Sequence, residues 1–272
     1  MSKRLIVVLG MHRSGTSTIT RGLQVLGVDL GSCLMPPAAG NNDKGFWEDL
    51  EINAFNVALL QSIGHDWNTP GTIAASDFAG PGPAGFRDQA VALLRKKFAD
   101  TDLFGMKDPR LARLLPFWLE VFGELRIEAS FVIASRQPLS VAESLAKRDG
   151  IPRKTACLLW FEHMHASLLL TAGKPRIVVD YDRVLDDPAT QLERIAKALN
   201  LPFDADSTAF QEYKREFLEL GLRHNRYSAT DLFQSMDIPG GVVELQGLLQ
   251  AFATDRLSLD NPQIQTIIEH LA

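Results

Sequence analysis

A short apolar run leads directly into a glycine-containing loop near the start of the chain. Leu5–Leu9 is followed by Gly10-Met-His-Arg-Ser-Gly-Thr-Ser17, and a helical pattern of apolar residues then covers Thr16–Leu26. This order of strand, tight turn and helix leaves free backbone N–H groups at the positive end of a helix dipole, where phosphate and sulfate bind. The sequence therefore predicts an anion-binding loop at the end of a buried strand.

Three more apolar runs share the continuous hydrophobicity of the first, which is typical of strands covered on both faces. We therefore expect four buried parallel strands at Leu5–Leu9, Leu103–Met106, Ser130–Ala134 and Ile177–Val179. The helical patterns cover Thr16–Leu26, Ile52–Ile63, Phe86–Phe98, Leu111–Phe122, Pro138–Lys147, Lys154–Leu170 and Pro188–Leu199. This alternation predicts an α/β fold, a P-loop-type doubly wound parallel sheet flanked by helices, which binds ligands outside the carboxyl ends of its strands.

The whole chain of 272 residues is expected to form a single domain. Its α/β core covers about 4–227, and residues 228–272 form a C-terminal helical extension, since no convincing strand follows Leu201. The loop His65–Gly85 is rich in glycine and proline, which suits a surface excursion from the core rather than a domain boundary.

Composition, charge and cysteine content exclude several classes of protein. Apolar residues make up 46% and charged residues 22% of the chain, as in an ordinary soluble globular protein. The formal net charge of −5 argues against a nucleic-acid partner, because nonspecific nucleic-acid binders carry a basic face. No apolar run approaches the ~20 residues that span a bilayer, so no transmembrane segment is expected. Cys33 and Cys157 form no Cys-x-x-Cys pair, which predicts reduced thiols and a cytoplasmic location.

A basic residue follows each of the first three expected strands. Arg13 lies in the first loop, Lys107 begins the segment Lys107-Asp-Pro-Arg110, and Arg136 begins Arg136-Gln-Pro138. If these strands are neighbours in a parallel sheet, the three cations converge on one rim. Such a rim would neutralise a ligand with several negative charges, despite the acidic total charge of the protein.

The first loop has the glycine spacing of a Walker A motif but lacks its lysine, because Thr16 follows the second glycine and the cation is Arg13 instead. The fourth strand ends at Asp180, which could hold magnesium in a P-loop kinase that phosphorylates a small metabolite with Mg-ATP. Without the lysine that reaches the β- and γ-phosphates, that alternative is the weaker one. We expect instead that Asp180 and Asp182 cap the following turn or pair with Arg183.

Together these motifs resemble those of the PAPS-dependent sulfotransferase family, in its bacterial carbohydrate- or small-molecule-type members. The loop Gly10–Ser17 looks like the 5′-phosphosulfate loop of that family, with a cation inside it. Arg136-Gln-Pro-Leu-Ser-Val-Ala-Glu-Ser144 looks like its 3′-phosphate element, an arginine at a strand end and a serine eight residues later on a helix. Pro138 suits the first turn of that helix. The resemblance covers residues 4 to about 227.

The resemblance implies transfer of a sulfuryl group from 3′-phosphoadenosine-5′-phosphosulfate (PAPS) to a hydroxyl or amine of a carbohydrate or other small acceptor. The product of the donor would be adenosine 3′,5′-bisphosphate (PAP), and no metal is required. The implied donor contacts are Arg13, Ser14, Gly15, Thr16, Ser17, Arg136 and Ser144. Leu222-Arg-His-Asn225 also resembles a late basic segment that closes over the nucleotide in relatives, which would make Arg223 a further phosphate contact.

Such a reaction needs cations for the developing charge and a base for the proton of the acceptor. Lys107 and Arg13 are the candidates for stabilising this charge. Asn41-Asn-Asp-Lys-Gly-Phe-Trp-Glu48 resembles a segment in which many carbohydrate-type relatives carry an acidic base, so Glu48 is the first choice. Two alternatives stay open: Glu48 could be a charge at a helix N-terminus, and His65 could be the base, as a histidine is in cytosolic relatives. A nucleotide-binding relative without catalysis is a further alternative.

The remaining histidines and aromatic residues favour structural roles. His163 and His165 are two apart on an expected helix, so they point to different sides and cannot form a metal-binding pair. Trp160, Phe161 and Met164 have the spacing of core residues on the same helix. We therefore expect packing from this segment.

Overall fold

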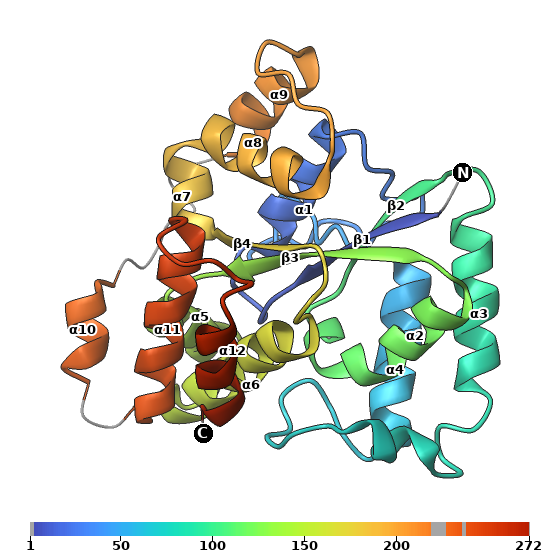
Figure 1. Cartoon of the computed structure of the whole chain (residues 1–272), viewed down its shortest axis with the longest axis horizontal. Coiled ribbons are helices and arrows are strands. Elements are labelled where there is room, and N and C mark those ends of the chain that lie inside the picture. The colour runs from blue at the N-terminus through green and yellow to red at the C-terminus, as the bar shows by residue number, and fades with distance from the viewer. Residues whose placement is uncertain (1–2, 219–226, 236–237, 272) are drawn as a thin grey trace.

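The computed structural model describes residues 3–218, 227–235 and 238–271 and contains, within them, a parallel sheet of four strands (Figure 1). The strand order is β2-β1-β3-β4. Their bounds are β1 Arg4–Leu9, β2 Leu103–Lys107, β3 Glu128–Ser135 and β4 Arg176–Asp180. All three pairings are parallel, and every expected strand is present. The predicted fold class is confirmed.

Helices cover both faces of the sheet (Figure 1). Alternate residues of β1 point to opposite faces, so each face contributes to its own apolar cluster. Leu5, Val7 and Leu9 belong to one apolar cluster, and Ile6 and Val8 to the other. One face carries α1 Thr16–Val25, α7 Tyr181–Asp186, α8 Pro188–Leu199 and α9 Thr208–Glu212. The other carries α2 Leu50–Ser62, α3 Phe86–Lys97, α4 Leu111–Glu124, α5 Pro138–Asp149 and α6 Arg153–Leu170.

The helix ends follow local sequence signals. Pro138 and Pro188 occupy the first turns of α5 and α8, where a missing N–H costs nothing. The side chain of Asp187 caps α8 by accepting a hydrogen bond from the backbone of the first turn. Gly150 and Asn200 end the two helices in the left-handed conformation. These signals explain why the expected bounds of both helices lie within two residues of the observed ones.

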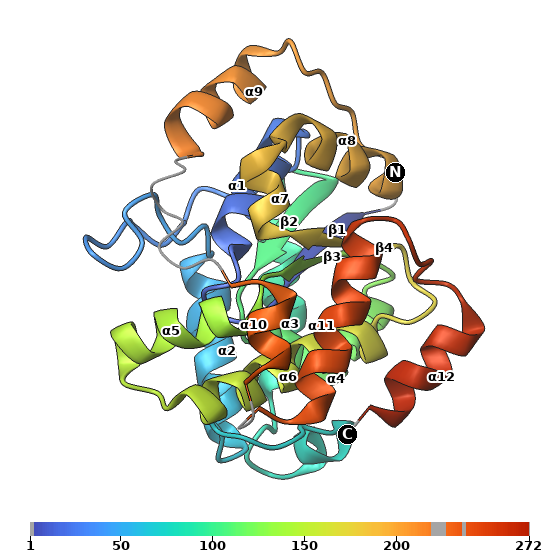
Figure 2. The same ribbon diagram turned by 90° about the vertical axis from the view of Figure 1, so that its left-hand side faces the viewer.

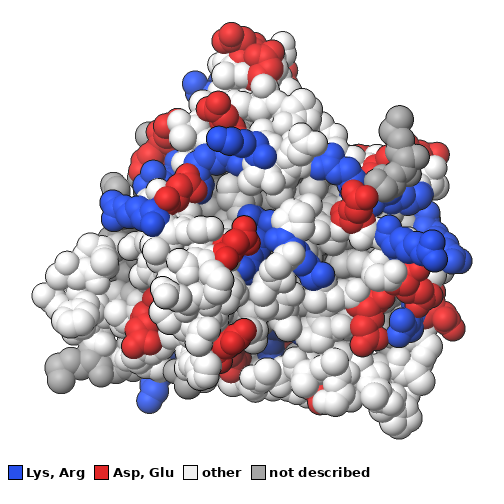
Figure 3. All heavy atoms as spheres, viewed as in Figure 1, with Lys and Arg blue, Asp and Glu red and all other residues white. Residues whose placement is uncertain are grey.

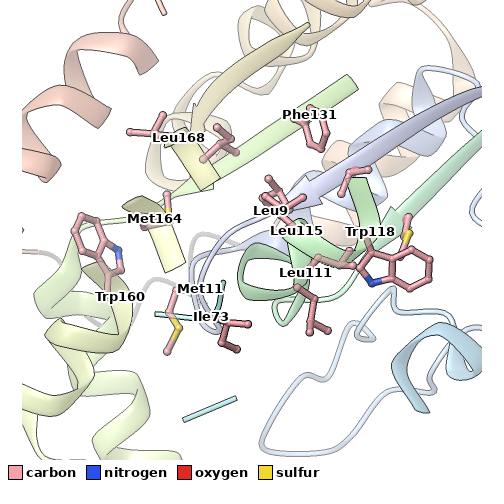
Figure 4. Close-up of a cluster of buried hydrophobic side chains, with 14 of the residues drawn as sticks. Leu9, Met11, Ile73, Leu111, Leu115, Trp118, Phe131, Trp160, Met164 and Leu168 are labelled. Atoms are coloured by element: carbon pink, nitrogen blue, oxygen red, sulfur yellow. The ribbon is translucent and has the colours of Figure 1, made fainter. Parts of the chain in front are cut away.

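The larger apolar cluster lies between the sheet and α2–α6, and Figure 4 shows part of it around Leu9 and Phe131. Trp160 and Met164 of α6 are fully buried there, which confirms the expected packing role of that helix. His163 is also buried, and burial lowers its pKa to about 3, so it stays a neutral core residue.

The C-terminal segment is helical where it is described. It contains α10 Ala229–Phe233, α11 Gly240–Ala253 and α12 Pro262–His270. Figure 2 shows α11 beside β4, the edge strand of the sheet, and α11 also packs on α6. Val242, Leu245 and Leu249 of α11 join the larger apolar cluster. This extension therefore covers one end of the sheet rather than hanging free of it.

The structure adds three short elements that the sequence patterns do not predict. A 3₁₀ helix, η1, covers Ala75–Ala79 inside the long loop, and α7 begins directly after β4. A π-helical turn, η2, covers Tyr213–Phe217. The elements are too short to show an apolar period of their own.

On the face shown in Figure 3, basic and acidic side chains are interspersed. Within the described ranges, no helix has both the length and the apolar character needed to cross a membrane.

Candidate functional site

The loop between β1 and α1 has the backbone of a phosphate-binding turn. Gly10, Arg13 and Gly15 all have positive φ angles, of 145°, 68° and 80°. A Cβ atom on Gly10 would lie 2.7 Å from the carbonyl oxygen of Ala134 on β3, so only glycine fits there. Gly15 is the N-cap of α1 and offers no side-chain oxygen to the first turn. The positive end of the helix dipole therefore faces outward without a capping side chain.

Tyr181 packs so closely against the loop that Gly15→Ala should be unusually destabilising. The new Cβ would overlap the tyrosine ring, and the residue would keep a positive φ angle. We expect the free energy of unfolding to fall by about 1–2 kcal/mol from the backbone and by about 1–3 kcal/mol more from overpacking. Urea unfolding measures the loss. Gly64→Ala is the matched control, because its φ is 74° and nothing lies within 4 Å of its added Cβ. Equal losses in the two variants would show that the ring moves aside.

Three basic residues from neighbouring strand ends line one cavity of about 730 Å³. Since β2, β1 and β3 are adjacent, Lys107, Arg13 and Arg136 emerge at the same edge of the sheet, as predicted. Among the described lining residues, seven are basic and three are acidic. The basic residues are Arg13, Lys44, Lys107, Arg110, Arg136, Lys147 and Arg148, and the acidic residues are Asp43, Glu48 and Asp149. The cavity is therefore electropositive within a protein of net charge −5.

One side of the cavity joins the first loop to α5. The Nε atom of Arg13 donates to Ser144 Oγ at 2.7 Å, and its Nη1 donates to the carbonyl oxygen of Asn41 at 2.9 Å. Arg136 Nη1 donates to the carbonyl oxygen of Arg13 at 3.1 Å, and its guanidinium lies over the ring of Tyr181, 4.7 Å from the centroid. Arg136 Nε is buried and has no hydrogen-bond partner among the described residues. Arg136, Ser144 and Arg13 thus form one group of donors.

A second group surrounds a buried ion pair. Lys107 Nζ lies 2.7 Å from Glu48 Oε1, and the side chains are only 2% and 6% exposed. The same ammonium donates to the carbonyl oxygen of Phe46 at 2.8 Å and to Ser17 Oγ at 3.3 Å. Burial raises the pKa of Glu48, and the charge of Lys107 opposes this rise. Asp49, not Glu48, caps α2 by accepting hydrogen bonds from the backbone of its first turn.

Several residues expected at the site are either not among the described residues that line the cavity or outside the described ranges. His65 is not among the described residues that line the cavity, and neither is the fully buried Ser14. Gly15, Thr16 and Ser17 do line it. Arg223 and the segment Leu222–Asn225 lie outside the described residues.

Asp180 lies at the N-terminus of α7. It caps α7 by accepting a hydrogen bond from the backbone N–H of Arg183 at 3.0 Å, which confirms the expected capping role. Burial raises its pKa to about 6. It is not among the described residues that line the cavity of about 730 Å³ around the first loop. In the part of the chain that the structure describes, no group of three or more His, Cys, Asp or Glu residues could hold a metal ion.

Solved structures similar to this chain include sulfotransferases. The sulfotransferase domain of the Synechococcus PCC 7002 olefin synthase is 18% identical in sequence. The match covers 93% of this chain and 96% of that chain, with a TM-score of 0.49. The sulfotransferase domain from the curacin biosynthetic pathway is 18% identical. The match covers 78% of each chain, with a TM-score of 0.45. Retinol dehydratase in complex with androsterone and the inactive cofactor PAP is 13% identical. The match covers 97% of this chain and 78% of that chain, with a TM-score of 0.36.

No family model matches the sequence, and no curated protein matches it either. Two of the solved structures are sulfotransferase domains, which is the family that the sequence motifs resemble.

Three residues at the site have no role assigned from the sequence, although Asn42 lies within the segment Asn41–Glu48. Asn53 on α2 donates from Nδ2 to Glu48 Oε2 at 2.8 Å, and Asn42 Nδ2 donates to Ser17 Oγ at 3.1 Å. Tyr181 stacks beneath Arg136 and directly follows β4. The rule that the residue after each strand faces the site would have found Tyr181. The two asparagines carry no such signal, because nothing in their spacing distinguishes them from surface amides.

Proposed function

We propose that this protein transfers a sulfuryl group from PAPS to a hydroxyl or amine of a carbohydrate or another small acceptor. The observation that carries the proposal is the convergence of Arg13, Lys107 and Arg136 on one cavity beside an uncapped helix N-terminus. A buried carboxylate, Glu48, faces the same cavity. Cations, an anion loop and a base are the parts that sulfuryl transfer requires.

The residues present fit a nucleotide with phosphate groups at both ends. The cavity volume of about 730 Å³ is in the range of small-molecule sites. The loop Gly15–Ser17 would hold the 5′-phosphosulfate, and Arg136 with Ser144 would hold the 3′-phosphate. The buried, unpaired Nε of Arg136 supports this assignment, because an orphaned donor of this kind implies a ligand. The hydrogen bond from Arg13 Nε to Ser144 Oγ supports a role for Arg13 beside the same 3′-phosphate.

When bound, PAPS supplies the sulfuryl group and leaves as PAP. Lys107 stabilises negative charge beside the loop, and its ammonium must release one of its three present acceptors to do so. Glu48 accepts the proton of the acceptor. Its raised pKa suits this role, because a base works best when its pKa approaches the working pH.

The rest of the cavity wall suits a polar acceptor. His12, Asn53 and Arg110 line it together with the apolar Met35 and the aromatic Trp67. The His12 and Trp67 rings are in contact, with centroids 4.4 Å apart. Hydroxyl groups could bond to the polar side chains while a sugar ring packs on the aromatic one, which supports a carbohydrate or similar acceptor.

Thermal unfolding with two nucleotides tests the donor. We expect PAP to raise the unfolding midpoint, since ligand at 100 times its Kd stabilises by about 2.7 kcal/mol. ADP with magnesium should give little or no shift, because Asp180 is not among the described residues that line the cavity. Stabilisation by ADP with magnesium alone would favour the kinase. Binding of PAP without any release of PAP from PAPS, over a panel of sugars and phenols, would favour a relative without catalysis.

The proposal includes a single domain over the whole chain and a cytoplasmic location. Support for the first is the packing of α11 on β4 and α6. Support for the second is that Cys33 and Cys157 are both free thiols.

A further inference from the structure

Both oxygens of the buried Glu48 carboxylate are engaged, by different partners. Lys107 holds Oε1 at 2.7 Å, and Asn53 Nδ2 holds Oε2 at 2.8 Å. The same Nδ2 lies 3.4 Å from Asp108 Oδ2. An amide nitrogen carries two protons, so Asn53 can donate to both carboxylates at once. It therefore bridges Glu48 to a second buried acid.

Asp108 is held rigidly on the far side of this bridge. It is fully buried, and its Oδ1 accepts hydrogen bonds from the backbone N–H of Arg110 at 2.9 Å and from Arg110 Nη1 at 3.1 Å. Its Oδ2 accepts from Asn56 Nδ2 at 3.1 Å. The amide of Asn56 cannot flip, because its oxygen accepts the indole N–H of Trp118 at 2.9 Å, and an indole can only donate. Asn53 and Asn56 are three residues apart, on the same face of α2.

We propose that Asn53 is a positioning residue, which holds Oε2 of Glu48 against the Asp108 network so that Oε1 is the oxygen that takes the proton of the acceptor. The inference rests on the proposed function, because it takes Glu48 as the base. The two carboxylate oxygens of Glu48 then have different roles. Oε2 stays fixed to the helix, and Oε1 becomes free when Lys107 turns to the transferred group.

The network acts on the proton affinity of Glu48 in two opposite directions. Asn53 donates to the charged form and so lowers the pKa, whereas the negative charge of Asp108 raises it. The charged groups that face Glu48 are Lys107, Asp108 and Arg110. His12 lines the same cavity but stays neutral, because burial first and then the charge of Arg110 lower its pKa. If Asn53 and Asp108 served packing alone, their replacement would not shift the pKa of Glu48 in opposite directions.

Titration of the Glu48 side chain by ¹³C NMR tests this, with the resonance assigned by its loss in Glu48→Gln. Asn53→Leu removes the donor, and we expect the pKa of Glu48 to rise by ~1 pH unit, because a hydrogen bond to a charged group is lost. Asp108→Asn removes a like charge, and we expect the pKa to fall. In kcat/KM for PAP release from PAPS, the acid limb should move to higher pH in the first variant and to lower pH in the second.

Gln61→Leu is the control, since it also replaces an amide by leucine, at an exposed position of the same helix, and should leave the titration unchanged. Asn53 is only half-buried and leucine is a better helix former, so Asn53→Leu should fold. Asn53→Gln provides a second variant that keeps the amide and should restore part of the effect. An unchanged pKa in both Asn53→Leu and Asp108→Asn would overturn this inference alone. Failure of the natural sequence to bind PAP or to release it from PAPS would instead overturn the proposed function.

Discussion

Glu48→Gln is expected to lower kcat for sulfuryl transfer by about 10²–10⁴-fold, the usual contribution of a positioned base. The amide keeps the shape of the side chain, and its oxygen can still accept a hydrogen bond from Lys107. It cannot take a proton from the acceptor. Binding of PAP should therefore change little, because the loss affects the reaction and not the donor contacts. The release of PAP from PAPS measures kcat, and titration calorimetry measures the affinity for PAP.

Glu51→Gln is the control for this variant. Glu51 lies three residues away on α2, pairs with Lys96 and Lys97, and has its pKa lowered to about 2 by those hydrogen bonds. Because it is not among the described residues that line the cavity, its replacement should leave kcat unchanged. Full activity in Glu48→Gln, together with a large loss in His65→Gln, would move the base to His65 despite its place outside the described cavity wall.

The sheet and its cationic rim could be predicted because both depend on local patterns. Each buried strand is a continuous apolar run, and the rule for parallel sheets places the residues that follow them at one edge. Arg13, Lys107 and Arg136 are found in this way without knowledge of any contact. The order of the strands then decides whether the three cations meet, and β1 does lie between β2 and β3.

The details of the site could not be predicted, because they depend on contacts between distant segments. Arg13 bonds to Ser144, 131 residues along the chain, which only the position of α5 decides. The loop that carries Trp67 reaches the cavity because the buried Arg113 donates to the carbonyl oxygens of Trp67 and Gly71. An arginine in an apolar helix gives no sign of such a task. The Asn53 bridge is of the same kind, since an amide on a helix is common at any surface.

Arg136→Ala is expected to weaken binding of PAP far more than binding of adenosine 5′-monophosphate, which lacks the 3′-phosphate. Arg136 is only 8% exposed and stacks on Tyr181, so a phosphate beside it would lose a desolvated, charged partner. Removal of one partner from such a pair costs about 2–5 kcal/mol, which corresponds to ~30-fold or more in Kd. Titration calorimetry with both nucleotides measures the difference.

The chemistry of the side chain allows a graded version of the same experiment. Arg136→Lys keeps a positive charge but loses the planar fork that matches a phosphate, so its loss should lie between those of the natural sequence and Arg136→Ala. Arg183→Ala removes an exposed arginine of α7 that is not among the described cavity residues, and it should change neither affinity. Equal losses for PAP and adenosine 5′-monophosphate would show that Arg136 serves the 5′ end or the loop itself, through its bond to the carbonyl oxygen of Arg13. A loss confined to PAP would instead identify the 3′-phosphate as its partner, and this distinguishes a PAPS site from one for an ordinary nucleoside triphosphate.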